Sequence, residues 1–218
     1  MEIRYYGHSC FRLTGAEGTT LVIDPYEPGG YRGGMRYSRI TEPADAVLVT
    51  HDHADHNYER GVPGEHEVID AAGGYQVGEA HITGMGEYHD DAHGRERGRI
   101  VIFNVELEGV RVCHLGDLGR VITHDQAEPL GRIDVLLVPV GGHFTIDARG
   151  ATQVVANLSP RVAIPMHYKT DRVDFPIAPV EDFLRSKPHV RRLPGSSLAL
   201  TPAALPDPPE IVVLQAEP

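Results

Sequence analysis

The sequence predicts an α/β layered domain. Strand-like runs dominate the first half of the chain, and strands follow helices in the second half, which indicates a mixed sheet with covering helices rather than a purely doubly wound sheet. With 218 residues, 41% of them hydrophobic, the chain can bury a full core. We therefore expect residues 1–218 to form one domain.

The first half is expected to fold mainly as hairpins. Ile3 to Leu13 and Thr19 to Asp24 read as two strands of one hairpin, since Gly15 and Gly18 separate them. Further strand signals come from Ala46 to Val49, from short runs between Glu67 and Gly86, and from a hairpin of Ile100 to Glu108 and Val110 to Leu115 that turns at Gly109. The glycine-rich stretch from Pro28 to Gly34 is read as a loop, which either borders an active-site mouth or is a flexible connection.

Helical spacing appears later in the chain. It predicts helices over Thr123 to Leu130, Asp147 to Leu158 and Val180 to Ser186, with Thr123, Asp147 and Pro179 near their starts. Two apolar strands, Ile133 to Val140 and Val162 to Met166, follow the first two helices. After a proline-rich stretch from Pro202 to Pro209, Ile211 to Leu214 predicts a last edge strand.

Charge and composition exclude several classes of protein. The formal net charge of −11, without any Lys/Arg cluster, disfavours nucleic-acid binding. No apolar run approaches a membrane span, and the strand-like start Met1 to Tyr5 does not resemble a signal peptide, so we expect a cytoplasmic protein without a membrane partner. Cys10 and Cys113 lie in strand-like segments and are expected to be buried thiols rather than a disulfide.

A histidine-rich motif directly after the strand that ends at Val49 predicts a metal site. It contains His51, His53, Asp55 and His56 within six positions. Imidazole and carboxylate together suit zinc, iron or manganese. One tetrahedral ion that keeps a position for water uses only three of these groups, so the surplus indicates a second ion. A histidine-rich surface turn would leave this clustering beside a buried strand unexplained.

Three later positions follow the same rule of a strand end running into a loop. They are His89, Asp117 and His167. Taken singly, each residue is more often a hydrogen-bonded structural group than a ligand. Their joint occurrence after the histidine-rich motif favours a metal site that draws on all of them.

These motifs together resemble the metallo-β-lactamase superfamily, whose fold is a four-layer αββα sandwich with a metal site at one edge. The resemblance rests on the His-x-His-x-Asp-His motif of residues 51–56, then His89, Gly116-Asp117 and His167, and covers nearly the whole chain. Residues 7–11, 23–25, 138–142 and 164–168 are similar to the small bacterial metal-dependent hydrolases related to the ascorbate-6-phosphate lactonase type. The motifs are specific for fold and metal site, but not for a substrate.

The resemblance implies a division of the ligands between two divalent ions. It places His51, His53 and His89 around the first ion, and Asp55, His56 and His167 around the second, with Asp117 bridging both. Zinc is expected, with manganese or iron as alternatives. A hydroxide between the ions would be the nucleophile. Asp55 would also hold that water and later carry its proton toward the leaving group.

Two neighbouring histidines compete with these assignments. His93 is the alternative to His89, which we prefer because it lies nearer the end of the preceding segment, whereas His93 abuts Gly94 in a loop. His114 lies three residues before Asp117 and, in an extended strand, points away from it, so it is read as structural or as a support for a ligand.

Other residues are expected to shape the pocket. His8 would hydrogen-bond a bridging ligand or a supporting carboxylate, and Asp24 would either orient a ligating histidine or fix a turn. His143 or Tyr168 would donate to a developing oxyanion, and Lys169 would favour an anionic group. The candidate catalytic residues are therefore Asp55, His8 and His143.

The site therefore predicts a hydrolase of a small, anionic ester, lactone or phosphoester. The alternatives are a metal-dependent nuclease, a di-iron redox protein of the same fold, and a binding or regulatory protein in which the metal serves folding alone. Edge strands and the proline-rich tail are compatible with a homo-oligomer, although nothing in the sequence sets its symmetry.

Overall fold

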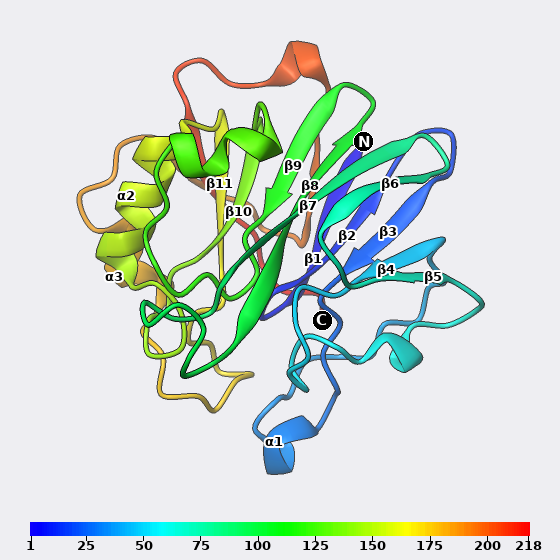
Figure 1. The fold of residues 1–218 in the computed structure, drawn as a ribbon, viewed down its shortest axis with the longest axis horizontal. Coiled ribbons are helices and arrows are strands. Elements are labelled where there is room, and N and C mark those ends of the chain that lie inside the picture. The colour runs from blue at the N-terminus through cyan, green and yellow to red at the C-terminus, as the bar shows by residue number, and fades with distance from the viewer.

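The protein, described here over residues 1–218 by a computed structural model, is built on two facing β-sheets (Figure 1). The smaller sheet has six strands in the order β13-β1-β2-β3-β4-β5. Its strands are β1 (Glu2–Gly7), β2 (Cys10–Thr14), β3 (Thr20–Ile23), β4 (Ala46–Leu48), β5 (Glu67–Ile69) and β13 (Ser197–Ala199). The chain therefore returns to the first sheet only near its C-terminus.

The larger sheet has eight strands in the order β12-β14-β11-β10-β9-β8-β7-β6. Its strands are β6 (Gly73–Val77), β7 (Ala80–Tyr88), β8 (Arg99–Leu107), β9 (Val110–His114), β10 (Val135–Pro139), β11 (Val162–Met166), β12 (Val190–Arg192) and β14 (Glu210–Val213). Pairing is antiparallel from β6 to β9 and parallel from β9 to β12. This change matches the predicted passage from hairpins to strands that follow helices.

The main core lies between the sheets and follows from side-chain alternation along the strands. In β1, Ile3 and Tyr5 face the second sheet, whereas Tyr6 faces outward. In β10, Val135 and Leu137 face the first sheet, whereas Leu136 and Val138 face the helices. Both faces of each sheet are therefore apolar, so each sheet needs a cover on its outer side.

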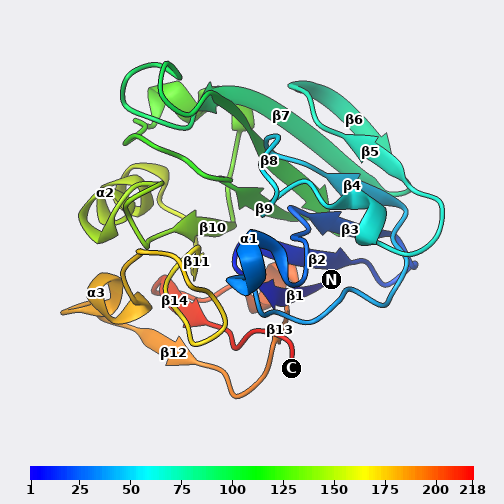
Figure 2. The same ribbon diagram turned by 90° about the horizontal axis from the view of Figure 1, so that it is seen from below.

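The two outer covers differ, as Figures 1 and 2 show. Helices α2 (Ala148–Leu158) and α3 (Val180–Leu184) and the 3-10 turn η2 (Asp125–Leu130) cover the larger sheet. The smaller sheet is covered mainly by the loops around the single turn α1 (Gly30–Gly33), with the short turn η1 (Glu59–Gly61) beyond them. The fold is the expected four-layer sandwich, but the layer over the smaller sheet is mostly irregular chain.

Two strand predictions were wrong in detail. The run from Ile3 to Leu13 is two antiparallel strands that turn at His8 and Ser9, where His8 has the left-handed φ of 54°. A turn at Gly7-His8-Ser9 was expected, but the apolar residues on both sides of it led to the reading of one continuous strand run. The last strand, β14, is not at the edge: it pairs with β11 on one side and with β12 on the other.

The helix predictions were better for the central helix than for the others. Helix α2 begins after the predicted cap Asp147, whose Oδ1 accepts the Gly150 N–H at 2.8 Å. The predicted helix over Thr123 to Leu130 is the 3-10 turn η2, which contains Pro129. A further short turn, η3 (Pro202–Ala204), lies in the proline-rich stretch. None of the helices has the length and apolar character needed to span a membrane.

Both cysteines are buried and unpaired, as expected.

Candidate metal centre

The candidate ligands lie at the C-terminal ends of four strands. The histidine-rich motif follows β4, His89 follows β7, Asp117 lies after β9, and His167 follows β11. The two sheets bring these ends together at one edge of the sandwich, because Asp117 lies within 3.5 Å of His56, His89 and His167. The structure thus unites all seven residues that were predicted to bind metal.

The ligand atoms form two groups. Within each group, the ligand atoms all lie within 4.8 Å of one another. We call His51, His53 and His89 the open group, because His53 is only half-buried and lies with His89 on the wall of a cavity. We call Asp55, His56 and His167, together with His8, the buried group. The division equals the one expected from the resemblance, with His8 as an addition.

Asp117 lies between the two groups. Its Oδ1 is 3.2 Å from Nε2 of His56 in the buried group. Its Oδ2 is 3.3 Å from Nε2 of His167 and 3.5 Å from Nε2 of His89, which belongs to the open group. One carboxylate can therefore reach both groups, which is the arrangement that a bridging ligand requires.

Buried polar atoms without partners show that these residues fit a metal. Nε2 of His51, His56 and His167 and Oδ1 of Asp117 are buried and make no hydrogen bond. His56 Nε2 and Asp117 Oδ1 face each other without hydrogen-bond geometry. Buried polar atoms are nearly always satisfied in folded proteins, so a cluster of unsatisfied imidazole nitrogens beside a carboxylate indicates cation binding.

Asp24 positions two of these histidines. Its fully buried carboxylate accepts the Nδ1–H of His56 at 2.8 Å and the hydroxyl of Thr50 at 2.7 Å. Because that hydroxyl donates to Asp24, it accepts from His51 Nδ1, 2.9 Å away. Both rings then have their Nε2 lone pairs free for a cation. The structure supports the orienting role of Asp24 over the reading as a simple turn residue.

His8 supports Asp55 from the turn between β1 and β2. Its Nε2 lies 3.1 Å from Asp55 Oδ2, and its ring packs on that of His167 with centroids 4.2 Å apart. The backbone carbonyl of His8 accepts the N–H of His167 at 2.8 Å. His8 therefore contacts a candidate ligand, Asp55, and not the bridging ligand or the supporting carboxylate that was expected.

Burial and neighbouring charges set the protonation of the site. Burial and the nearby His167 lower the pKa of His8 to about 4, and burial together with His56 lowers the pKa of His51 to about 3. Burial would also lower the pKa of His56, but the carboxylates of Asp117, Asp55 and Asp24 raise it well above its usual range. Burial opposes ionisation of Asp117, yet His167 and His56 hold its pKa well below the ordinary value.

A cavity of about 460 Å³ opens beside the two groups. Besides four of the candidate ligands, it is lined by Phe144, which directly follows His143 and was expected to contact a substrate if its loop faced the metals. The other lining residues were not singled out from the sequence: Tyr31, Glu96, Arg97 and Phe175. Tyr31 comes from the glycine-rich loop and donates its hydroxyl to Asp55 Oδ1 at 2.7 Å. That loop therefore borders the mouth of the site, which was one of its two predicted roles. The glycines around Tyr31 were the one signal that pointed to it.

Tight backbone approaches hold the loop that carries Asp117. Gly116 has a φ of 53°, and a Cβ there would lie 2.9 Å from the Thr50 side chain. A Cβ on Gly119 would lie 2.2 Å from the backbone of His89. Only glycine fits at these positions, so the loop can bring Asp117 against both histidine-bearing segments.

The two competing histidines lie outside the centre. His93 belongs to neither ligand group, is exposed, and packs edge-on against Tyr88. His114 is fully buried and satisfied, since its Nε2 lies 2.8 Å from Ser9 O and its Nδ1 accepts the Gly116 N–H at 3.0 Å. The preference for His89 and the structural reading of His114 agree with this geometry.

Three predicted substrate contacts are not placed as expected. His143 is exposed and does not line the cavity, although its carbonyl accepts a hydrogen bond from Arg97. Tyr168 and Lys169 line a different hollow, and Lys169 Nζ donates to Phe175 O at 3.1 Å. The chain turns away directly after His167, so these neighbours in sequence are not neighbours of the cavity. The geometry therefore gives the catalytic role predicted for His143 no support.

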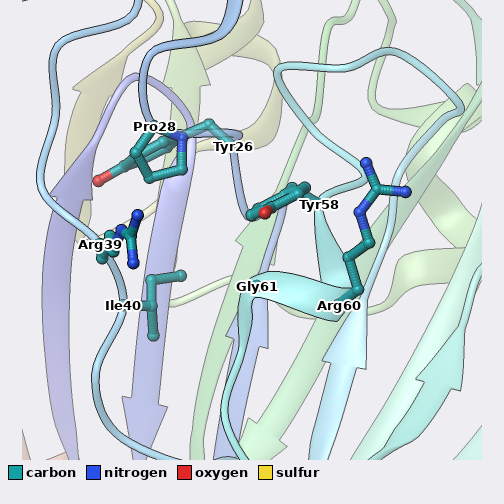
Figure 3. Close-up of a pocket in the computed structure, with 7 residues that line it drawn as sticks. All are labelled: Tyr26, Pro28, Arg39, Ile40, Tyr58, Arg60 and Gly61. Carbon is teal, nitrogen blue, oxygen red and sulfur yellow. The ribbon is translucent and has the colours of Figure 1, made fainter.

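A further hollow of about 280 Å³ lies apart from the ligands (Figure 3). It is lined by Tyr26, Pro28, Arg39, Ile40, Tyr58, Arg60 and Gly61, and Arg60 lies over the ring of Tyr58. No candidate ligand lines it, so it is not part of the metal centre.

Comparison with known proteins identifies the fold and family. A model of the beta-lactamase superfamily domain matches residues 2–167. A UPF0173 metal-dependent hydrolase from Pyrococcus horikoshii is 32% identical over 198 residues, which cover 78% of this chain and 85% of the relative. The crystal structure of a proposed Zn-dependent hydrolase of the metallo-β-lactamase superfamily from Thermotoga maritima is 39% identical with a TM-score of 0.80, covering 98% of this chain and 97% of that one.

A more distant structure shares the fold alone. CmlA, a diiron β-hydroxylase from Streptomyces venezuelae, is 18% identical with a TM-score of 0.54, and the match covers 76% of this chain and 44% of that one. Together with the two ligand groups, the closer matches lead to one conclusion: this chain belongs to the metallo-β-lactamase superfamily and, within it, to the UPF0173 metal-dependent hydrolases.

Proposed function

We propose that the protein is a binuclear metal-dependent hydrolase of a small, anionic ester, lactone or phosphoester, with zinc as the expected metal. The observation that carries this proposal is the pair of ligand groups that share Asp117 beside a cavity. The open group and Asp117 would hold one ion, and Asp55, His56, His167 and Asp117 would hold the other. When bound, two such ions make a water molecule ionisable near neutral pH and polarise the bond to be cleaved.

The two oxygens of Asp55 have different surroundings. Oδ2 faces His8 and lies 3.6 Å from His56 Nε2, inside the buried group. Oδ1 faces the hydroxyl of Tyr31 at the mouth of the cavity. We therefore assign Oδ2 to metal binding and Oδ1 to the proton that leaves the attacking water and passes to the leaving group.

His8 is assigned a positioning role. With its pKa lowered to about 4 it is neutral near pH 7, so it can donate its Nε2 hydrogen to Asp55 Oδ2 without adding a positive charge. This contact orients the carboxylate whose other oxygen handles the proton.

The test combines metal content with turnover. Protein purified without added metal is analysed for bound ions, and hydrolysis of para-nitrophenyl acetate, γ-butyrolactone and bis(para-nitrophenyl) phosphate is measured before and after chelation and after zinc is restored. We expect close to two ions per chain and hydrolysis that chelation abolishes and zinc restores. Turnover that survives complete removal of metal would overturn the proposal.

The same measurement, with RNA added as a further substrate, separates the alternatives. Iron with visible absorbance and no hydrolysis would favour a di-iron redox protein, and cleavage of RNA alone would favour a nuclease. We propose small-molecule chemistry because the net charge of −11 opposes binding of a polyanion. The two unpaired thiols fit the reducing cytoplasm that was predicted for the protein.

A further inference from the structure

The cavity beside the candidate ligands is lined by one basic side chain, that of Arg97. Among the nine residues that line the cavity, Arg97 is the single Arg or Lys. Asp55 and Asp117 are proposed metal ligands, so their charges are directed at the ions. The charged groups left to face a substrate are Arg97 and Glu96.

The backbone of Arg97 is held by a buried carboxylate. Asp90 is 3% exposed and accepts three backbone N–H groups, from Gly94 at 2.8 Å, Glu96 at 3.1 Å and Arg97 at 2.8 Å. Asp90 directly follows His89, whose own N–H donates to Gly98 O at 3.1 Å. The backbone of the loop that carries Arg97 is thus tied to a candidate metal ligand, His89.

The guanidinium of Arg97 forms one long ion pair and no hydrogen bond to a carboxylate. Its Nη2 donates to His143 O at 3.2 Å, and its Cζ lies 5.8 Å from the centroid of the Phe144 ring. The nearest carboxylate oxygen, on Glu96, is 3.9 Å from Nη1, beyond hydrogen-bond distance, and that side chain is 65% exposed. Several N–H groups of Arg97 therefore remain available for an anion.

Aromatic side chains form the surface beside this cation. The rings of Phe144 and Phe175 lie edge-to-face with centroids 6.0 Å apart, and Tyr31 packs on Phe175 at 4.9 Å. Such a surface accepts the apolar part of a ligand, whereas the guanidinium binds its charged end.

We propose that Arg97 determines specificity by binding a carboxylate or phosphate of the substrate, whose apolar portion packs on Phe144 and Phe175. The inference rests on the proposed function and deepens it: the anionic group is not the one that is cleaved, but a second group that Arg97 holds away from the metal ions.

The first experiment compares two esters that differ in that group. In mono-para-nitrophenyl adipate a carboxylate replaces the terminal methyl of para-nitrophenyl hexanoate, and the leaving group is the same. We expect the zinc-loaded protein to prefer the adipate ester in kcat/KM. In Arg97→Gln this preference should fall by about ten- to a hundredfold, mainly through KM for the adipate ester.

Matched variants separate charge from shape. Arg95→Gln removes an equal charge two residues away, on an exposed side chain that donates to Ala92 O and does not line the cavity, and should leave the preference intact. Arg97→Lys should retain part of the preference for the anionic ester, because lysine keeps the positive charge but lacks the planar guanidinium that donates two parallel hydrogen bonds. Glu96→Gln should strengthen the preference for the anionic ester, since the substitution removes the one carboxylate that competes with the substrate for Arg97. An equal preference in the parent protein and Arg97→Gln would overturn the inference while leaving hydrolysis established.

A binding experiment keeps the inference testable without turnover. Isothermal titration of the zinc-loaded and metal-free protein with phenylacetate and with phenylphosphonate distinguishes a carboxylate from a phosphate-like group. We expect at least one to bind, and Arg97→Gln to weaken it about tenfold or more in both metal states. Binding that depends on Arg97 without any ester, lactone or phosphoester hydrolysis would reject the proposed function alone. Binding of neither anion, or binding unchanged in Arg97→Gln, would reject the role of Arg97.

Discussion

The buried and open ligand groups meet at Asp117 but differ in how they are built. In the buried group His8, His56 and His167 have no exposed surface, and Asp24 and His8 orient its members from behind. In the open group His53 is half-buried, and His89 leads into the loop of residues 89–98 that reaches the cavity.

The difference separates two tasks of one site. A fully buried group of polar side chains is costly unless each member is satisfied, so the buried group ties metal binding to the stability of the fold. The open group has fewer supporting contacts and borders the cavity, so it is suited to meeting a substrate. We expect changes in the buried group to affect metal content and stability, and changes at the cavity wall to affect kinetics.

The largest effect is expected where the two groups meet. Asp117→Asn removes the charge that both groups share, so the metal content should fall in both and kcat/KM for the best generic substrate should drop by more than about a hundredfold. Metal analysis and steady-state kinetics check this. The control is the exposed Asp125→Asn. A variant that keeps two ions per chain and most of its activity would contradict a bridging Asp117.

A change behind the buried group comes next. Asp24→Asn weakens a direct hydrogen bond to His56, but it reaches His51 of the open group only through Thr50. Affinity for the ion of the buried group should therefore fall about ten- to a hundredfold, and affinity for the ion of the open group should fall less. Competition with a chelator of known affinity measures the dissociation constants of both ions. The exposed Asp70→Asn serves as the control. Equal weakening of both ions would erase the distinction between the two groups.

Acidification should destabilise the buried group in the metal-free protein. The folded state lowers the pKa of His8 to about 4, from an ordinary value of 6.5. Between pH 6.5 and 4 the His8 side chain is protonated in the unfolded chain but stays neutral in the folded protein. The contribution of neutral His8 to the free energy of unfolding is therefore fully present above pH 6.5 and is lost as the pH falls toward 4. One pKa unit corresponds to about 1.4 kcal/mol, and we expect a loss of at least about 1 kcal/mol.

Urea unfolding at a series of pH values, with His8→Gln beside the parent protein, isolates this contribution. His51 changes stability in the same direction and His56 in the opposite one, but both are present in the two proteins. The stability difference between parent and variant should therefore shrink on acidification. If the free energy of unfolding changes with pH in the same way in both proteins, folding does not lower the pKa of His8.

The smallest effect is expected at the mouth of the cavity. Tyr31→Phe removes the hydroxyl that donates to Asp55 Oδ1 and keeps the ring on Phe175, so kcat should change by about fivefold or less, with metal content unchanged. Tyr75→Phe, which loses a hydrogen bond to Ala71 O on an exposed strand, is the matched control. Loss of metal in Tyr31→Phe would show that the mouth also supports the buried group.

Local patterns predicted much of this molecule. The motif of residues 51–56 and the strand ends before His89, Asp117 and His167 identified the residues that the structure brings together, because ligand chemistry depends on residue type and on a turn directly after a strand. Helix α2 was predicted with its cap, since Asp147 and the apolar spacing after it act within a few residues. The pairing of β1 with β2 across the turn at His8 was missed because apolar residues continue on both sides of the turn.

By itself, the sequence determined the layered α/β class, the candidate ligands and their family resemblance, since these follow from periodicity and short motifs. Only the tertiary structure decided which side chains line the cavity. Lys169 lies two residues after His167 in sequence but in another hollow, whereas Tyr31 and Arg97 reach the cavity from loops far apart in the chain. The physical reason is that ligand positions are set by local turns at strand ends, while the cavity wall is set by how separate loops pack over the edge of the sandwich.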